Sequence, residues 1–346
     1  KGDAAQGRIV VGTQRCEIFE CHLNIDARSL AAVGDQPLMN GHFKDELWGL
    51  AIHPRLLEYC TTGDDQTIRI WSMQPPRMKS IQALGGMART CAYHPDGNMI
   101  AIGFGGRVGR SVVGTKKAID GTVRVLDSRT LRVLYEKQDL KKWVSDIKFS
   151  SNGSCLAAGG HDNMIVVYSM TQNMARIAKF CKHNSYITHF DFSIDGNYLQ
   201  SNCGGYELLF SETSTGKQIT SASKLRDQNW ASWTCVLGWP VQGIWPAFSD
   251  GTDINAVDRS HSGHLIATAD DFGKVKLFRY PCVEKGAQSN EYLGHSSHVT
   301  NVRWTYDDRQ LVSLGGNDKS IFVWEVSQQS TSKLSRSGSA ISDNAQ

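Results

Sequence analysis

A turn motif that recurs along the chain constrains its fold more than any other feature. Each copy combines an aromatic or apolar residue, two turn-prone residues and often a glycine, and an apolar run follows it. Counted at its second residue, the motif occurs at His53, His94, Ser150, Ser193, Ser260 and Thr305. Three of the five intervals are 41 to 45 residues long, which is the period of a four-stranded β-propeller blade. The two longer intervals contain insertions, near residues 105–119 and 222–250.

A second spacing supports the same period. An Asp follows the apolar run, and an aromatic or apolar residue lies six positions later, as in Asp65 and Trp71. The other copies are Asp120 with Leu126, Asp162 with Tyr168, Asp318 with Trp324, Gly204 with Phe210 (glycine in place of Asp), and Asp271 with Phe278, which is one residue longer. The residues between are β-branched or alternate in polarity, and long amphipathic helical patterns are absent. The chain is therefore predicted to be all-β.

The residues at these positions resemble those of WD-repeat proteins, in which a His, a Ser or Thr, an Asp and a Trp can join in one hydrogen-bond network. One set is His42, Thr61 or Thr62, Asp65 and Trp71; the other is His295, Ser313, Asp318 and Trp324. We interpret both sets, and Asp162, as structural, because a buried Asp that accepts from an imidazole is a satisfied polar pair. His, Asp and Ser also make up a hydrolase triad, but a nucleophile is needed once, whereas this set recurs in two blades and is degraded in others. No catalytic residue and no enzymatic activity are predicted.

Six repeat units run from residue 41 to residue 325, and the segment before them predicts further strands at residues 8–13, 16–20 and 29–33. We expect residues 1–40 to complete a closing blade beside the last unit, and residues 41–326 to form the other propeller blades. Residues 327–346 hold seven serines and are expected to be a disordered tail. The predicted fold is a WD-repeat β-propeller of seven four-stranded blades, because a closed circle leaves no free sheet edge. Eight blades are the alternative if residues 222–250 form strands of their own.

Composition excludes several functions. A net charge of +3 is too small to favour nucleic acid as the partner. The nine cysteines form no CxxC pair, and most lie in apolar runs, so they indicate buried thiols in a reducing compartment. No run of 18 apolar residues and no signal peptide is present, which predicts a cytoplasmic protein without membrane contact. The chain starts at Lys1 without an initiator Met, and we expect it to be part of a longer protein.

A Trp-rich stretch gives a more specific likeness. Residues 230–239, continuing through residues 243–246 and 250–256, resemble the echinoderm microtubule-associated protein-like family, in the second propeller of its tandem atypical propeller domain. Residues 45–50, 161–165, 269–275 and 295–302 point the same way, and the likeness spans about residues 8–326. It implies a non-enzymatic scaffold of the microtubule cytoskeleton whose propeller binds tubulin or microtubule-associated partners. The alternative is a general WD-repeat adaptor that recruits signalling or chaperone proteins without touching tubulin.

Candidate contact residues come from the first insertion and from the starts of predicted strands. The insertion carries Arg107, Arg110, Lys116 and Lys117, which are expected to contact an acidic protein surface in a salt-sensitive way. Its glycines have Walker-type spacing, but the order Thr115-Lys116 and the missing helix argue against nucleotide binding. Trp48, Trp143 and Tyr186 begin first strands and, with His298, are candidates for a contact on one face. His295 and His298 lack a third ligand, so neither a metal nor a cofactor is predicted.

The four tryptophans of the second insertion have two interpretations. They are an aromatic hot spot for a partner, or they pack the insertion against the edge of the propeller. We favour packing, because an exposed patch of that size would promote aggregation. The residues concerned are Trp230, Trp233, Trp239 and Trp245.

Overall fold

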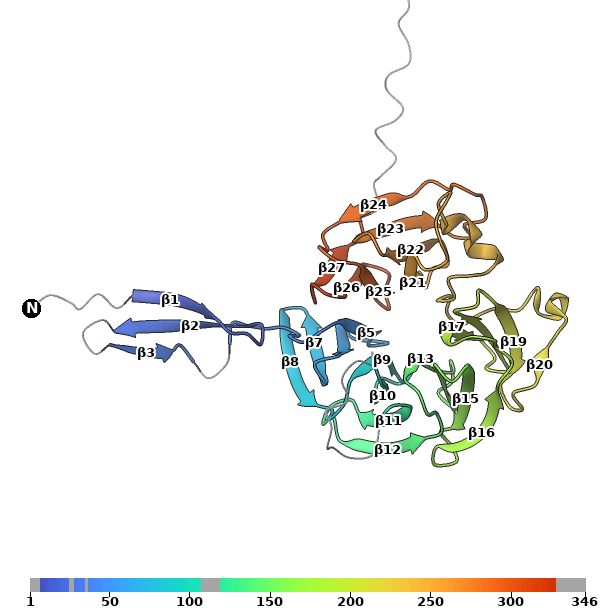
Figure 1. Cartoon of the computed structure of the whole chain (residues 1–346), viewed down its shortest axis with the longest axis horizontal. Coiled ribbons are helices and arrows are strands. Elements are labelled where there is room, and N and C mark those ends of the chain that lie inside the picture. The colour runs from blue at the N-terminus through green and yellow to red at the C-terminus, as the bar shows by residue number, and fades with distance from the viewer. Residues whose placement is uncertain (1–6, 25–27, 35–36, 107–118, 328–346) are drawn as a thin grey trace, which may run out of the picture.

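The computed structural model describes residues 7–24, 28–34, 37–106 and 119–327. Within them the chain forms seven antiparallel sheets, which confirms the predicted all-β propeller. Six sheets surround a common centre, with the first strand of each facing inward and the last lying outside (Figure 1). No helix in the described part of the chain is long and apolar enough to span a membrane.

The first three sheets of the ring have four strands each. The first contains β5 (Leu47–Ile52), β6 (Glu58–Gly63), β7 (Thr67–Met73) and β8 (Pro76–Ala83). The second contains β9 (Ala88–Tyr93), β10 (Met99–Phe104), β11 (Thr122–Asp127) and β12 (Val133–Gln138). The third contains β13 (Val144–Phe149), β14 (Cys155–Gly160), β15 (Met164–Ser169) and β16 (Ala175–Phe180).

The remaining sheets continue the circle. The fourth contains β17 (Ile187–Phe192), β18 (Tyr198–Cys203), β19 (Leu208–Glu212) and β20 (Gln218–Ile219). The fifth contains β21 (Ile254–Arg259), β22 (Leu265–Asp270), β23 (Lys274–Arg279) and β24 (Asn290–Leu293). The sixth has three described strands, β25 (Val299–Trp304), β26 (Gln310–Gly315) and β27 (Ile321–Glu325).

The recurring turn motif joins the first two strands of a blade. Gly97 and Gly153 have φ angles of +79° and +72° at this turn, a conformation that glycine adopts without strain. The apolar runs that follow are buried between neighbouring sheets; one such cluster packs Ile68 and Ile70 of the first sheet against Ile100 and Ile102 of the second. The sequence period therefore corresponds to the structural repeat.

The N-terminal strands lie elsewhere than expected. β1 (Gly7–Gly12), β2 (Glu17–Asn24), β3 (Ser29–Ala32) and β4 (Met39–Asn40) form a sheet of their own, which extends away from the ring (Figure 1). The last and first sheets of the ring instead contact each other directly, since Thr300 Oγ1 donates to the Leu47 carbonyl at 2.6 Å and Asn301 Nδ2 to the Trp48 carbonyl at 2.9 Å. The N-terminal strands do not take part in this join.

The second insertion lies between the fourth and fifth sheets of the ring. It contains two 3₁₀ helices, η1 (Ala222–Leu225) and η2 (Trp239–Ile244), and an isolated bridge between Ser193 and Trp230, but no described strand. The eight-blade alternative is therefore not supported. Trp230 and Trp233 are buried and Trp245 packs beside them, whereas Trp239 is 67% exposed.

Residues 230–237 of this insertion stand where the inner strand of a blade would lie. Elsewhere in the ring, an Asp of one inner strand accepts a backbone N–H from the next: Asp146 from Phe190 at 3.0 Å and Asp258 from Trp304 at 2.8 Å. Asp191 of β17 accepts in the same way from Thr234 at 2.9 Å. The other side of the segment is joined to β21, because Arg259 N donates to the Trp233 carbonyl at 3.2 Å. Six sheets and this segment together complete the circle.

Candidate interaction site at the entrance of the central cavity

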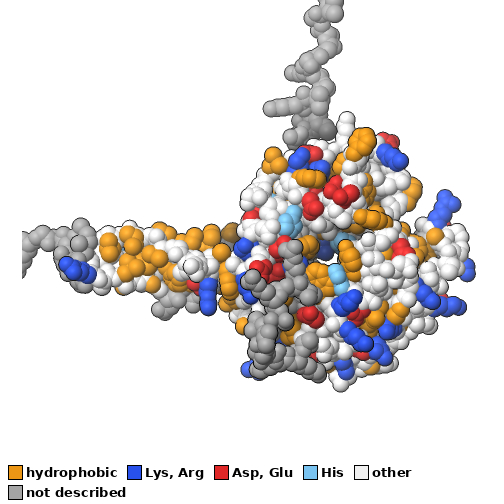
Figure 2. Space-filling view, in the orientation of Figure 1, with side chains coloured by type: hydrophobic (Ala, Val, Ile, Leu, Met, Phe, Trp, Pro, Cys, Tyr) orange, Lys and Arg blue, Asp and Glu red, His pale blue; other side chains and the backbone are white. Residues whose placement is uncertain are grey.

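The centre of the ring is a cavity of about 630 Å³. It is lined by the inner strands of the six sheets and by residues between 231 and 237. One lining lysine is compensated by carboxylates, since Lys148 Nζ lies 3.0 Å from Asp146 Oδ2 and 3.8 Å from Asp191 Oδ1. Histidine and hydrophobic side chains gather around the centre of the ring in Figure 2.

Four side chains singled out from the sequence lie at one end of the inner strands. Trp48 is the second residue of β5, while Trp143, Tyr186 and His298 immediately precede β13, β17 and β25. The starts of β25 and β5 are adjacent in space, since Thr300 donates to the Leu47 carbonyl and the ring centres of His298 and Trp48 lie 6.0 Å apart. The four side chains therefore lie on the same face, and all but His298 line the cavity entrance.

Arg89 of β9 holds two of these tryptophans together. Its guanidinium carbon lies 5.2 Å from the centre of the Trp48 ring and 5.0 Å from that of Trp143, which is cation–π geometry. Arg89 Nε donates to Asp64 Oδ1 at 2.8 Å, and its Nη2 lies 3.1 Å from Glu46 Oε2. Glu46 also accepts from Trp48 Nε1 at 2.9 Å. Two carboxylates thus compensate the Arg89 charge and fix its orientation.

His161 extends this arrangement to the next blade. Its ring centre lies 4.0 Å from that of Trp143 and 4.4 Å from that of Tyr186, on which it stacks. Burial, with Lys142 and Arg89 nearby, lowers the pKa of His161 to about 3, so the ring is neutral at pH 7. We call the set Trp48, Arg89, Trp143, His161, Tyr186 and His298 the aromatic rim. Sequence reasoning missed Arg89 and His161, because an Arg within a strand and a His in a turn carry no signal of their own.

The predicted structural network is present in the first blade. His42 Nδ1 lies 2.9 Å from Asp65 Oδ2 and His42 Nε2 lies 2.8 Å from Thr61 Oγ1, while Trp71 Nε1 donates to the same hydroxyl at 2.8 Å. Burial lowers the pKa of His42 although Asp65 opposes the shift, so the imidazole is neutral. Of the two threonines that the sequence offered, Thr61 belongs to this network.

The last blade has a variant of it. Ser313 Oγ lies 2.7 Å from His295 Nε2 and accepts from Trp324 Nε1 at 2.8 Å. Asp318 is 3.7 Å from His295 Nδ1 and reaches it through Ser320, whose hydroxyl contacts both. Asp162, in the third blade, accepts from the backbone N–H of Lys141. Among the hydrogen bonds of the described residues, none joins Asp162 to a histidine ring.

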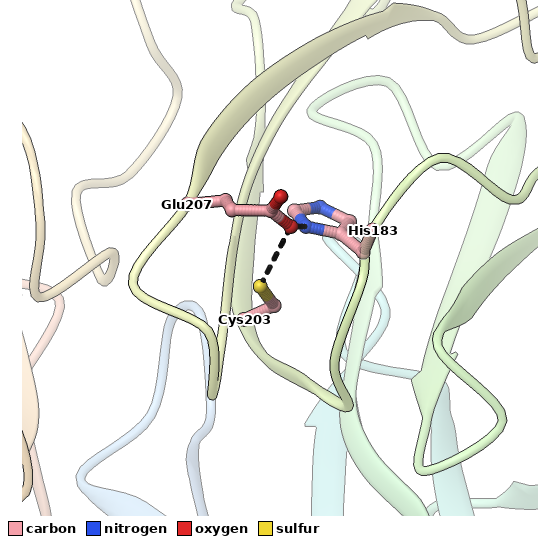
Figure 3. Close-up of side chains that lie close together, drawn as sticks. All are labelled: His183, Cys203 and Glu207. Atoms are coloured by element: carbon pink, nitrogen blue, oxygen red, sulfur yellow. Dashed lines mark hydrogen bonds and ion pairs between the residues drawn. The ribbon is translucent and has the colours of Figure 1, made fainter.

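A third version, which the sequence did not reveal, lies in the blade β17–β20. His183 Nε2 is 2.7 Å from Ser201 Oγ, and His183 Nδ1 is 3.3 Å from Glu207 Oε2 (Figure 3). Glu207 thus supplies the carboxylate that an Asp supplies in the other two blades. The six-residue spacing in the sequence places Gly204 at the position of that Asp. Cys203 Sγ donates to the same Glu207 oxygen at 3.1 Å. A hydrogen bond from the Asn184 backbone, then one from Cys203, lowers the pKa of Glu207 to about 2.

Comparison with known proteins places this ring in a family. The model of the echinoderm microtubule-associated protein second beta-propeller matches residues 47–326. The chain belongs to the echinoderm microtubule-associated protein-like family. The match covers the six sheets and the Trp-rich insertion. It confirms the resemblance that this insertion indicated in the sequence.

Among curated family members, echinoderm microtubule-associated protein-like 2 of Rattus norvegicus is 41% identical over 328 residues, covering 93% of this chain and 47% of the relative. Echinoderm microtubule-associated protein-like 3 of Homo sapiens is 41% identical over 299 residues, covering 85% of this chain and 32% of the relative. Echinoderm microtubule-associated protein-like 1 of Mus musculus is 39% identical over 321 residues, covering 92% of this chain and 37% of the relative. The chain thus spans about a third to a half of the length of these family members.

The remaining predicted contact residues of this family member cannot be placed. Arg107, Arg110, Lys116 and Lys117 lie outside the described residues. The described part of the site is therefore the aromatic rim and the cavity that it surrounds.

Proposed function

We propose that this chain is a non-enzymatic scaffold of the cytoplasmic microtubule cytoskeleton, which binds tubulin or a microtubule-associated partner through its aromatic rim. The relatives are named microtubule-associated proteins, and the chain shares their second propeller. One observation carries the choice of surface: Arg89 is fixed between Trp48 and Trp143 at the cavity entrance.

The chemistry of the rim favours protein recognition. Trp, Tyr and Arg are the residue types that dominate binding energy at protein interfaces. Here Arg89 and His161 hold the aromatic rings in place, so binding costs little side-chain entropy. Tyr186 remains 39% exposed and offers its ring and hydroxyl to a partner.

The His–Ser–carboxylate sets support a scaffold and not an enzyme. In the first blade Thr61 is fully buried, and its hydroxyl is shared by His42 and Trp71. In the last blade the fully buried Ser313 is shared in the same way by His295 and Trp324. A hydroxyl that is buried and already bonded on both sides is poorly placed to attack a substrate.

Co-sedimentation with microtubules, and size-exclusion chromatography with soluble tubulin, test this function. We expect Tyr186→Ala to weaken binding by about tenfold, the loss of one interface contact of about 1.4 kcal/mol. Tyr306→Ala is the matched control: Tyr306 is 38% exposed, but it follows its inner strand whereas Tyr186 precedes one, so it lies on the opposite face. No binding to either form of tubulin at low salt, or equal losses in both variants, would contradict the proposal.

A further inference from the structure

Three side chains of different metal-ligand types meet at one end of the blade β17–β20. The ligand atoms of His183, Cys203 and Glu207 all lie within 4.8 Å of one another (Figure 3). The three residues are far from consecutive: His183 precedes β17, Cys203 ends β18, and Glu207 follows in the turn before β19. The spacing gave no sequence motif, so the fold alone brings them together.

The separations suit a tetrahedral ion. Zinc binds His nitrogen, Cys sulfur and carboxylate oxygen at roughly 2.0 to 2.3 Å, so ligand atoms around it lie about 3.3 to 3.7 Å apart. His183 Nδ1 and Glu207 Oε2 are 3.3 Å apart, and Cys203 Sγ and Glu207 Oε2 are 3.1 Å apart. The third pair of ligand atoms, those of His183 and Cys203, also lies within 4.8 Å, so an ion between the three atoms requires side-chain movements that close this pair.

The thiol is an addition to the structural network of the other blades. Cys203 pairs with Ile187 at the start of its inner strand, as Gly63 pairs with Leu47 and Gly315 with Val299. A Cβ atom on Gly315 would lie 1.8 Å from a carboxylate oxygen of Asp318, so the network of the last blade has no room for a side chain there. In the blade β17–β20 the carboxylate comes instead from Glu207, four residues after Cys203. The blade therefore holds a soft sulfur ligand that its network does not require.

Neighbouring groups orient two of the ligands. Ser201 is buried and lies 2.7 Å from His183 Nε2, which directs Nδ1 toward Glu207. With an ion on Nδ1, the imidazole proton would reside on Nε2 and be donated to the Ser201 hydroxyl, which itself faces the Leu209 carbonyl at 3.4 Å. Asn184 donates its backbone N–H to Glu207 Oε2 at 3.0 Å and fixes the carboxylate.

We propose that His183, Cys203 and Glu207 form a zinc-binding site that clamps the turn after β18 to the start of β17. The side chain of Glu207 is 24% exposed, which gives the ion access from solvent and leaves the fourth position for a water molecule. This site goes beyond the proposed scaffold function, because it requires no partner protein.

Coordination changes the protonation of the site. Zinc binds a cysteine as the thiolate, so the proton that Cys203 Sγ donates to Glu207 must leave when the ion enters. Zinc binding is therefore expected to release a proton into solvent.

The test is titration of the full chain with Zn²⁺ in competition with a chelating dye, and with Co²⁺ as a spectroscopic probe. We expect one equivalent to bind and Co²⁺ to show a thiolate charge-transfer band. Cys203→Ala should remove this band and weaken zinc binding by at least about 100-fold, since even groups that only support a ligand contribute 10- to 100-fold. Cys181→Ala, which removes an exposed thiol just after β16, should leave both unchanged.

Two further measurements keep the result decisive. Melting of each variant without metal separates loss of the ligand from loss of the fold, and zinc should raise the melting temperature of the wild type but not of Cys203→Ala. If Cys203→Ala does not fold, Glu207→Gln replaces it, because the amide keeps the shape and loses the charge. Absence of stoichiometric zinc binding in the wild type, or equal affinity in Cys203→Ala and the wild type, overturns the proposal.

Discussion

The carboxylate of Asp191 binds the backbone N–H of Thr234 at 2.9 Å, and this contact attaches the Trp-rich segment to the inner strand of the preceding blade. Asp191 is fully buried and also accepts from the Ser232 hydroxyl at 2.6 Å and from the Cys235 N–H at 3.1 Å. Its role matches that of Asp146 and Asp258, which join neighbouring inner strands. A segment without described strands thus keeps the ring continuous.

Asp191→Asn is expected to lower the free energy of unfolding by about 3 kcal/mol, because it replaces a buried carboxylate by an amide that cannot accept all these hydrogen bonds and leaves Lys148 without this partner. Urea denaturation followed by circular dichroism measures the change. Asp227→Asn, at an exposed position of the same insertion, should change stability by less than about 0.5 kcal/mol. Equal effects would show that the segment is not held through Asp191.

Local periodicity predicts the blades but not the way the ring is completed. The turn motifs and the spacing from Asp65 to Trp71 follow from contacts within one blade, so sequence reasoning found them. The contact between Asp191 and Thr234 joins residues 43 positions apart and has no fixed spacing in the sequence. Local pattern also predicts the N-terminal segment as strands, but it does not show where their sheet lies. The strands therefore were predicted, whereas their position beside the last unit was not correct.

The candidate site likewise contains residues that the sequence predicts and residues that it does not. Trp48, Trp143 and Tyr186 could be predicted as a group, because each stands at the start of an inner strand and the repeat places all starts on one face. Arg89 could not, since its role depends on Asp64 and Glu46 of the neighbouring blade. Glu207 could not either, because the turn, counted between paired residues, has the same length as that between β6 and β7 but carries its carboxylate four residues after the end of the strand, whereas Asp65 follows its strand by two.

Arg89→Lys tests whether the aromatic rim depends on the planar guanidinium. A lysine keeps the charge but cannot bind Asp64 through two nitrogens or stack between the rings of Trp48 and Trp143. We expect a loss of about 2 kcal/mol in the free energy of unfolding and a change in tryptophan fluorescence. Arg129→Lys, at an exposed turn, is the control and should alter neither. Unchanged fluorescence in Arg89→Lys would mean that the rim is held without Arg89.

His161 makes the stability of the protein depend on pH. Burial, with Lys142 and Arg89, lowers its pKa in the folded state to about 3, whereas an unfolded chain has a histidine pKa of about 6.5. Between these values the unfolded state binds a proton that the folded state does not, so the free energy of unfolding falls as the pH falls through this window. His189, with a pKa lowered to about 4 chiefly by burial, acts in the same direction.

His161→Phe keeps an aromatic ring between Trp143 and Tyr186 and removes the titrating group. Urea denaturation at several values between about pH 7 and 5, above the ordinary range of carboxyl groups, should therefore show a smaller loss of stability in this variant than in the wild type. Identical slopes in the two proteins would show that His161 is not protonated on unfolding in this range.

Thr61 and Thr62 provide a matched pair for the network of the first blade. Both are fully buried, but Thr61 Oγ1 contacts His42 and Trp71, whereas Thr62 Oγ1 has no hydrogen-bond partner. Thr61→Val should cost about 2 kcal/mol in the free energy of unfolding, because it leaves a buried imidazole nitrogen and an indole N–H unsatisfied. Thr62→Val should be neutral or stabilising, since it replaces an unpaired hydroxyl by a methyl group of the same shape.

Thermal and urea denaturation of both variants measure the difference, and the double variant should equal the sum of the two if the hydroxyls act separately. The comparison isolates the hydrogen bonds, because both substitutions are at neighbouring positions of β6 and change the side-chain volume equally. A cost in Thr62→Val as large as that in Thr61→Val would assign the effect to packing of the strand. The opposite order would mean that the imidazole and the indole are stabilised by groups other than Thr61.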